Sequence, residues 1–288
     1  MTTEVNGLVI LAVSVLPLAA GYALMASGFW ISFSVGRFFD LSLGVAFLVG
    51  GYATHLFSQR MPIPLAMIAA AALAAVCGWG IGVSLVQPLA RRVKPLPLFV
   101  GTLAAVQLAQ AVISIGFGPE ARVLPGDPQR IGALLLTGPE IAEVALALIL
   151  VVLLAASLQF SAWGRQARAL ADNPQLATLY GVDQRKILQR AYAVSGLFAG
   201  VAGVFFVADR AIDPTRAMAM LLVAMVATIL GGTSIAGVVF AATVLASLET
   251  GLGYAMPGGW KETAAFAVLV PLMVVRARGL THIVDRSF

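Results

Sequence analysis

The residues that could carry chemistry in this chain are few, and their spacing does not bring them together. None of the lysines lies in the Gly-x-x-x-x-Gly-Lys-Ser/Thr pattern that binds nucleotide phosphates. The single cysteine, Cys77, cannot form a disulfide within the chain, and His55 and His282 lack the spacing of metal ligands. We therefore expect no catalytic residue, no metal site and no cofactor.

Uncharged polar side chains inside an apolar run are the stronger candidates for function. Thr102, Gln107 and Gln110 lie in one such run, and positions three apart share a helix face. A glutamine amide in lipid is costly without partners, so we expect this face to turn inward. It would either bond to another helix or line a path for a polar solute. Other candidates for the same path are Asp40, Ser42, Gly231, Gly232, Thr233, Ser234 and Glu249.

Glu249 is the best candidate for a buried charge, because it follows a long uncharged run. An intramembrane carboxylate suggests a role in the path, whereas a position at the outer end of a span needs no function. The other predicted spans are nearly free of charge, which disfavours an ion-coupled pump.

The composition indicates which elements must position these residues. Hydrophobic residues make up 60% of the chain and charged residues 11%, against about 25% charged in ordinary soluble domains. A soluble fold could not cover its surface with so few charges, which excludes a soluble enzyme, a nucleic-acid binder and a disordered chain. The net charge of +5 fits the excess of Lys and Arg in cytoplasmic loops. We expect an all-α, polytopic helix bundle surrounded by lipid, forming one domain over residues 1–288.

The uncharged runs define the spans, since a helix needs about 20 residues to cross the bilayer. As one helix, run 217–248 would be about 48 Å long, so the glycines of Gly231–Gly237 predict a turn between spans at about 217–231 and 235–253. Run 5–36 either breaks near Pro17 and Gly21 or forms one long tilted helix. We count nine spans, with eight to ten possible; the remaining runs are 41–59, 61–90, 95–119, 144–164, 191–208 and 260–275.

The distribution of basic residues predicts the orientation. Segments 88–95 and 161–190 and the C-terminal tail are rich in Arg and Lys, as cytoplasmic segments are. Segment 118–143 carries four acidic and two basic residues and should face outward. With nine spans, the N-terminus lies outside and the C-terminus in the cytoplasm.

The basic loop 161–190 contains signals for a short helix. Asn173 is a typical N-cap residue, Pro174 suits the first helical position and Gly181 suits the position after the end. The predicted helix covers 174–180 and can either lie on the lipid surface or dock into a groove of a partner protein. Its apolar face consists of Leu176, Leu179 and Tyr180.

The stretch Gly164–Val182 resembles the coupling loop of ABC importer permeases of the branched-chain amino acid (LivH/LivM) type. That family has a pattern close to R-A-x-x-x-(N/D)-x-x-x-A-x-x-x-G-(I/V). Farther along, Gly231–Gly237 resembles the family's G-G-x-x-S-x-x-G turn, and Arg276–Leu280 resembles its R-P-R-G-L ending, with Ala277 in place of Pro. The matches in the coupling loop are Arg168, Ala169, Asn173, Ala177, Gly181 and Val182.

The resemblance implies a permease subunit of a bacterial plasma-membrane importer that works by alternating access. Its implied partners are a second permease subunit, identical or paralogous, two ATPase subunits and an extracytoplasmic substrate-binding protein. Branched-chain amino acids are the first expected cargo, followed by other amino acids, urea or short amides. Contact with the ATPases is expected at Arg168, Ala169, Asp172, Asn173, Pro174, Leu176, Ala177, Leu179, Tyr180, Gly181 and Val182.

The first half departs from the family pattern. Permeases of this type usually carry an (I/V)-N-F-A-H-G box after the first span, whereas Gly36–Gly44 lacks Asn and His and contains a charge pair, Arg37 with Asp40. Two other classes remain as alternatives. An ion-coupled secondary transporter would use a broken helix such as the Gly231–Gly237 turn. A membrane-embedded enzyme would need titratable groups that converge, and the sequence offers none.

Overall fold

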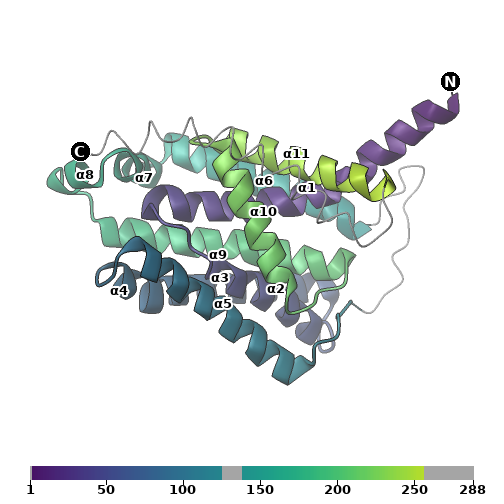
Figure 1. The fold of residues 1–288 in the computed structure, drawn as a ribbon, viewed down its shortest axis with the longest axis horizontal. Helices are drawn as coiled ribbons and strands as arrows, with labels where there is room; N and C mark the ends of the chain where they lie inside the picture. The colour runs from purple at the N-terminus through teal and green to yellow at the C-terminus, as the bar shows by residue number, and fades with distance from the viewer. Residues whose placement is uncertain (1, 125–137, 256–288) are drawn as a thin grey trace.

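The computed structural model describes residues 2–124 and 138–255, and these ranges form a bundle of helices, which confirms the all-α class (Figure 1). The long helices are α1 (Thr2–Gly36), α3 (Ile63–Ile81), α5 (Pro95–Phe117), α6 (Gly138–Phe160), α9 (Gln184–Asp209) and α11 (Ile235–Ala255). The π-helix η1 (Gly82–Val86) and α4 (Gln87–Ala90) continue α3. The shorter helices are α2 (Leu43–Phe57), α7 (Ala162–Asp172), α8 (Pro174–Leu179) and α10 (Arg216–Gly231).

Six helices of the described ranges are long and apolar enough to cross a membrane. Helices α2 and α10 are apolar but have only 15 and 16 residues. At 1.5 Å per residue they are about 22 and 24 Å long, shorter than the ~30 Å hydrocarbon core. The predicted span 260–275 lies outside the described residues, so the count of nine remains a prediction.

The structure decides whether the two long uncharged runs, 5–36 and 217–248, each form one helix or two. Residues 2–36 form one continuous helix that contains Pro17, so the break considered there does not occur. The run 217–248 does break at Gly232, whose φ of 70° ends α10, and α11 begins at Ile235. The Trp30 indole N–H donates to the Gly232 carbonyl over 3.0 Å and ties this turn to α1.

Helices α1 and α9 form the centre of the bundle, and α10 crosses them obliquely (Figure 1). Helix α9 packs against α1, α2 and α3, while α1 also packs against α6, α10 and α11. Much of the surface of α3, α5 and α6 remains exposed in the single chain and carries large apolar residues, as expected for a surface in contact with lipid or other membrane helices.

Glycines let α9 approach its neighbours at backbone distance. A Cβ on Gly203 would lie 2.0 Å from the carbonyl oxygen of Phe47 on α2. A Cβ on Gly50 would lie 2.2 Å from the carbonyl oxygen of Gly200, and one on Gly78 of α3 would lie 2.6 Å from Cα of Gly196. Gly196 and Gly200, which lie four residues apart on α9, therefore allow close packing between helices of one chain.

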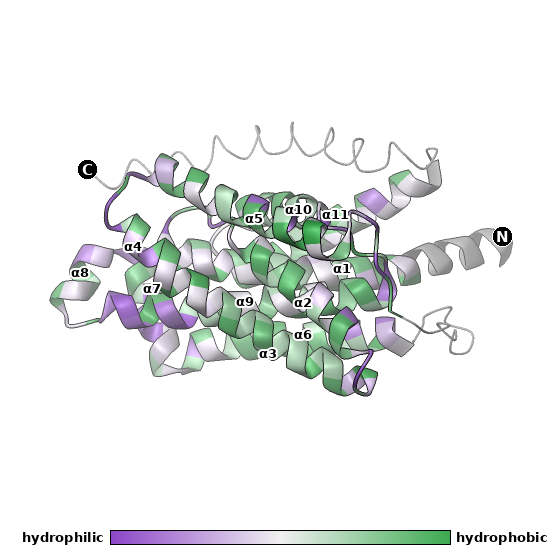
Figure 2. Cartoon of the chain, turned by 90° about the horizontal axis from the view of Figure 1, so that it is seen from below, coloured by the Kyte–Doolittle hydropathy of each residue, from purple (hydrophilic) through white to green (hydrophobic). Residues whose placement is uncertain are grey.

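The two ends of the bundle differ in charge. The basic segments around α4 and α7–α8 lie at one end, where hydrophilic residues gather (Figure 2). The 118–124 segment lies at the opposite end, where Arg122 and Ile212 exchange two backbone hydrogen bonds of 2.8 Å. The basic segments and 118–124 thus lie at opposite ends of the bundle; the side of the membrane that each end faces remains a prediction.

The carbonyl oxygen of Phe47 belongs to the α2 backbone and cannot move aside alone, so Gly203→Ala should lower the free energy of unfolding by about 1–3 kcal/mol. Gly80→Ala is the matched control, since a Cβ on Gly80 meets nothing within 4 Å, and alanine in a helix is neutral or more stable by up to about 1 kcal/mol. Thermal unfolding of both variants in detergent measures the difference. Equal unfolding temperatures would contradict the packing account.

Candidate coupling surface and transport path

The basic loop begins with a helix that the sequence analysis missed. Ser161 caps the start of α7, because its hydroxyl accepts a hydrogen bond from the Gly164 N–H at 2.9 Å. Ala167 and Leu170 are buried, so one side of α7 packs on the bundle while its charged side stays in solvent. The signal was present as a Ser N-cap before the alternating apolar and basic positions of 162–172.

The predicted cap and stop of α8 are confirmed. The Asn173 side-chain oxygen accepts hydrogen bonds from the N–H groups of Gln175 and Leu176, both at 3.1 Å. Pro174 occupies the first helical position, and Gly181 follows the end with φ of 84°. The helix ends at Leu179, one residue earlier than predicted, and the Val182 N–H closes the turn on the carbonyl of Ala177 at 3.0 Å.

The predicted apolar face of α8 points away from the bundle. Leu176, Leu179 and Tyr180 are 52%, 82% and 87% exposed, and only Ala177 among the α8 residues is buried. We call these three exposed side chains the α8 patch. Such a patch at the tip of a basic loop needs lipid or a partner protein to cover it.

A residue of the same loop caps the start of the next helix, α9. Asp183 caps α9 by accepting from the N–H groups of Arg185 and Lys186, and its carboxylate pairs with the Lys186 ammonium at 3.2 Å. Backbone and side-chain hydrogen bonds from Lys186 lower the pKa of Asp183. Asp183 therefore keeps the start of α9 fixed over the physiological pH range.

The predicted charge pair between Arg37 and Asp40 is wrong, because the two side chains go to different partners. The Arg37 guanidinium donates to the carbonyl oxygens of Ala171 and Asp172, at 2.6 and 2.7 Å. Asp40 is 1% exposed, and its carboxylate accepts from the Ser42 N–H and hydroxyl, at 2.9 and 2.6 Å. Asp40 is thus part of the interior.

Two other candidate path residues, Ser42 and Thr102, lie beside Asp40 or the residue next to it. Ser42 bonds to Asp40 directly, and the Leu41 N–H donates to the hydroxyl of the buried Thr102 at 3.3 Å. Ser32 of α1 also approaches Asp40, with its hydroxyl 3.4 Å from the carboxylate. These contacts form a polar cluster between α1, α2 and α5.

The two glutamines do not share an inward face in the single chain. Gln110 is buried, and its side-chain NH2 has no hydrogen-bond partner among the described residues. Gln107 is exposed, so the expectation of a common inward face is wrong for this residue. The buried stripe of α5 recurs every four residues, as Leu98, Thr102, Val106 and Gln110. Spacing alone left open which glutamine would join it.

The remaining candidates lie apart from the Asp40 cluster. In the Gly231–Gly237 turn, a Cβ on Gly231 would lie 2.3 Å from backbone atoms of Val238, so this glycine is required by close packing. Ser234 and Thr233 are exposed, and the Ser234 hydroxyl accepts from the Gly237 N–H to cap α11. Glu249 is half-buried on α11 and accepts a hydrogen bond from the Tyr22 hydroxyl on α1.

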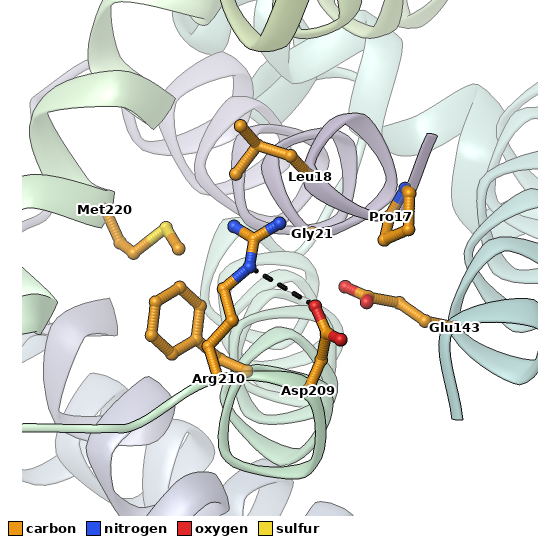
Figure 3. A pocket seen from close by; sticks show the side chains of 8 residues that line it. Pro17, Leu18, Gly21, Glu143, Asp209, Arg210 and Met220 are labelled. Carbon is orange, nitrogen blue, oxygen red and sulfur yellow. Dashed lines mark ion pairs between the residues drawn. The ribbon is translucent and has the colours of Figure 1, made fainter. Parts of the chain in front are cut away.

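The position predicted for Glu143, at the other end of the bundle, is wrong. The sequence analysis placed Glu143 in an outward loop, but it lies in α6 and is 4% exposed. Its carboxylate points toward Gly21 of α1, beside the ion pair of Asp209 and Arg210, whose charged atoms are 3.2 Å apart (Figure 3). Helix α6 starts earlier than the uncharged run suggested, and this start carries Glu143 into the packed region. Within residues 2–124 and 138–255, no group of three or more His, Cys, Asp or Glu is placed to hold a metal ion.

A bundle of apolar helices that carries a capped helix at its basic end is compatible with the permease subunit of an importer. The chain belongs to the family described as branched-chain amino acid transport system / permease component, which matches residues 11–275. It is a multi-pass protein of the bacterial inner membrane.

The names of similar proteins mention different substrates. The chain is 28% identical over 236 residues to the fructose import permease protein FrcC of Rhizobium meliloti, covering 74% of this chain but only 62% of that protein's length. It is 22% identical over 284 residues to the high-affinity branched-chain amino acid permease LivH of Salmonella typhimurium, covering 91% and 92%. It is 29% identical over 233 residues to the autoinducer 2 permease LsrC of Escherichia coli, covering 77% and 66%.

A similar fold is found among solved structures. An example is PsaBC from Streptococcus pneumoniae in complex with Fab, with a TM-score of 0.51 and 13% sequence identity over 90% of this chain and 89% of that chain. At this identity the likeness concerns the fold alone.

Removing the cap of α8 should loosen the loop locally. Asn173→Ala should cost about 0.5–2 kcal/mol, equivalent to roughly 2- to 30-fold faster amide exchange in 174–180. Asn173→Asp keeps an acceptor oxygen and should exchange like the original chain. Hydrogen–deuterium exchange of the peptide around α8 measures both variants, and identical exchange for Asn173→Ala would show that the cap contributes nothing.

Proposed function

We propose that this chain is one permease subunit of an ATP-driven importer, acting as a single transmembrane domain. In this proposal it pairs with a second permease subunit, two ATPase subunits bind the end that carries α7 and α8, and a substrate-binding protein delivers cargo at the opposite end. The single observation that carries the proposal is the α8 patch: a capped helix at the basic end of the bundle holds Leu179 and Tyr180 almost fully exposed.

The position of the patch favours a protein partner over lipid. Helix α8 has only six residues and lies beyond the apolar body of the bundle, at the end where hydrophilic residues gather (Figure 2). Its ends are fixed by Asn173 and by the turn at Gly181, so the patch is presented in one orientation. A preorganised apolar helix face suits a groove on a partner, where exposed Leu and Tyr side chains serve as anchors.

We propose that the transport path runs along the polar interior near α5. Asp40, Ser42 and Thr102 form one cluster, and Gln110 lies two helical turns farther along the buried stripe of the same helix. A buried amide without a partner costs about 1–3 kcal/mol, and the Gln110 NH2 is one such group among the described residues, so a polar solute passing along α5 would supply the hydrogen bond that it lacks. A path of this kind suits a neutral or zwitterionic solute.

For cargo, we infer amino acids, with branched-chain amino acids first. The LivH relative matches over nearly the whole of both chains, whereas the fructose permease matches over 62% of its length. Other amino acids, urea and short amides are further candidates for a path lined by small polar groups. Selection among them would fall mainly to the substrate-binding protein.

A charge placed in the α8 patch should break the contact with the ATPases. Leu179→Asp should reduce co-purification of the ATPase subunits at least tenfold, because the carboxylate would have to be desolvated in the interface. Val123→Asp is the matched control: this residue is also an exposed apolar side chain, 53% accessible, at the opposite end. Both variants should insert in the membrane normally. Unchanged association of Leu179→Asp would show that α8 is a surface helix.

The proposed path predicts different effects on uptake for substitutions of Gln110 and Gln107. Gln110→Leu should abolish uptake while the complex assembles and its ATPase still responds to loaded binding protein. Gln107→Leu, on the exposed side of the same helix, should transport normally. If the two variants transport equally well, or if Gln110→Leu fails only because the complex dissociates, Gln110 does not line the path.

A further inference from the structure

The segment between α1 and α2 makes a direct contact with the coupling loop. Helix α1 ends at Gly36, and the next residue, Arg37, has φ of 56°. This left-handed conformation is uncommon for a residue with a long side chain and persists only where surrounding contacts enforce it. The contact that follows is with α7, more than 130 residues along the chain.

The Arg37 guanidinium binds the C-terminal end of α7. One of its terminal nitrogens, Nη2, lies 2.6 Å from the carbonyl oxygen of Ala171 and 2.7 Å from that of Asp172. Carbonyls in the last turn of a helix lack helical partners and carry the negative end of the helix dipole, so a cation there is well placed. Asn173, the cap of α8, is the very next residue, so Arg37 holds the junction between α7 and α8.

The other end of the same short segment is anchored in the interior. Asp40 is buried and binds Ser42 and Ser32, and Leu41 donates to Thr102 of α5. Residues 37–42 therefore join the α7–α8 junction to the polar cluster of the proposed path. Chains of packed and hydrogen-bonded residues of this kind can carry coupling between distant sites when an element in them has two arrangements.

We propose that Arg37 is a positioning residue that transmits displacement of the coupling loop to the Asp40 cluster. This inference rests on the proposed function, because it assumes that ATPase subunits move α8. When the α7–α8 junction moves, the guanidinium carries residues 37–42 with it and changes the position of Asp40 and Ser42. Loss of the guanidinium should then separate ATP hydrolysis from transport without preventing assembly.

The test uses the assembled importer in proteoliposomes, with uptake and ATP hydrolysis measured together. Arg37→Gly removes the guanidinium and suits the positive φ, and Arg37→Asn also tolerates this backbone conformation but cannot reach α7. Both should retain ATPase association and basal hydrolysis within about twofold while uptake per ATP hydrolysed falls at least tenfold. Arg37→Lys, which keeps the charge but lacks the planar fork, should recover part of the uptake.

Arg60→Asn is the control, since Arg60 is an exposed arginine outside the coupling loop and the path, and its uptake should be unchanged. Normal uptake per ATP hydrolysed in Arg37→Gly and Arg37→Asn would overturn the inference. Loss of ATPase association or a large fall in the unfolding temperature of these variants would also overturn it, because Arg37 would then have a structural role only. Failure of the proposed function is a different result: the unaltered chain would then bind no ATPase and show no ATP-driven uptake.

Discussion

Direct backbone contact between α9 and its neighbours is the constraint on which the rest of the structure depends. Lipid tails are as apolar as the helices they surround, so burial alone cannot hold membrane helices together. Gly203 and Gly50 bring α9 against α2, and Gly196 meets Gly78 of α3. These contacts fix the middle of α9, around residues 196–203, and α1 also packs on α9 to complete the centre.

The fixed centre positions both ends of the molecule. At one end, α9 begins at Asp183, directly after the loop that carries α8, so the α8 patch is held relative to the bundle. At the other end, α9 terminates beside Glu143, where Asp209 pairs with Arg210. A long helix between the end that we propose to bind the ATPases and the end that carries Glu143 is suited to carry small movements from one to the other.

Local patterns in the sequence predicted the local structure well. Asn173, Pro174 and Gly181 specified α8, and the Gly231–Gly237 run specified the α10–α11 turn, because caps and turns depend on nearby residues. Long-range partners were not predictable in this way. The proximity of Arg37 and Asp40 in sequence suggested a pair, but α7 supplied better-placed carbonyl oxygens for the guanidinium.

The same limit applies to the path. Helical spacing grouped Gln107 with Gln110, but only the packing of α5 decides that Gln110 is inside. The prediction put Glu143 in a loop for a related reason. The span was taken to begin only where the charged residues end, whereas α6 begins at Gly138 and includes Glu143. Sequence thus predicted the class of fold and the cap and end of α8, whereas the interior contacts required the three-dimensional arrangement.

The central claim is that ATP hydrolysis by partner subunits drives uptake through this chain. The most direct measurement is solute uptake by proteoliposomes that contain the chain, its ATPases and the loaded binding protein, with ATP and ion gradients supplied separately. The account predicts uptake that requires ATP and continues when ionophores abolish all ion gradients. Uptake that proceeds without ATP and follows an imposed ion gradient would contradict it and establish a secondary transporter instead.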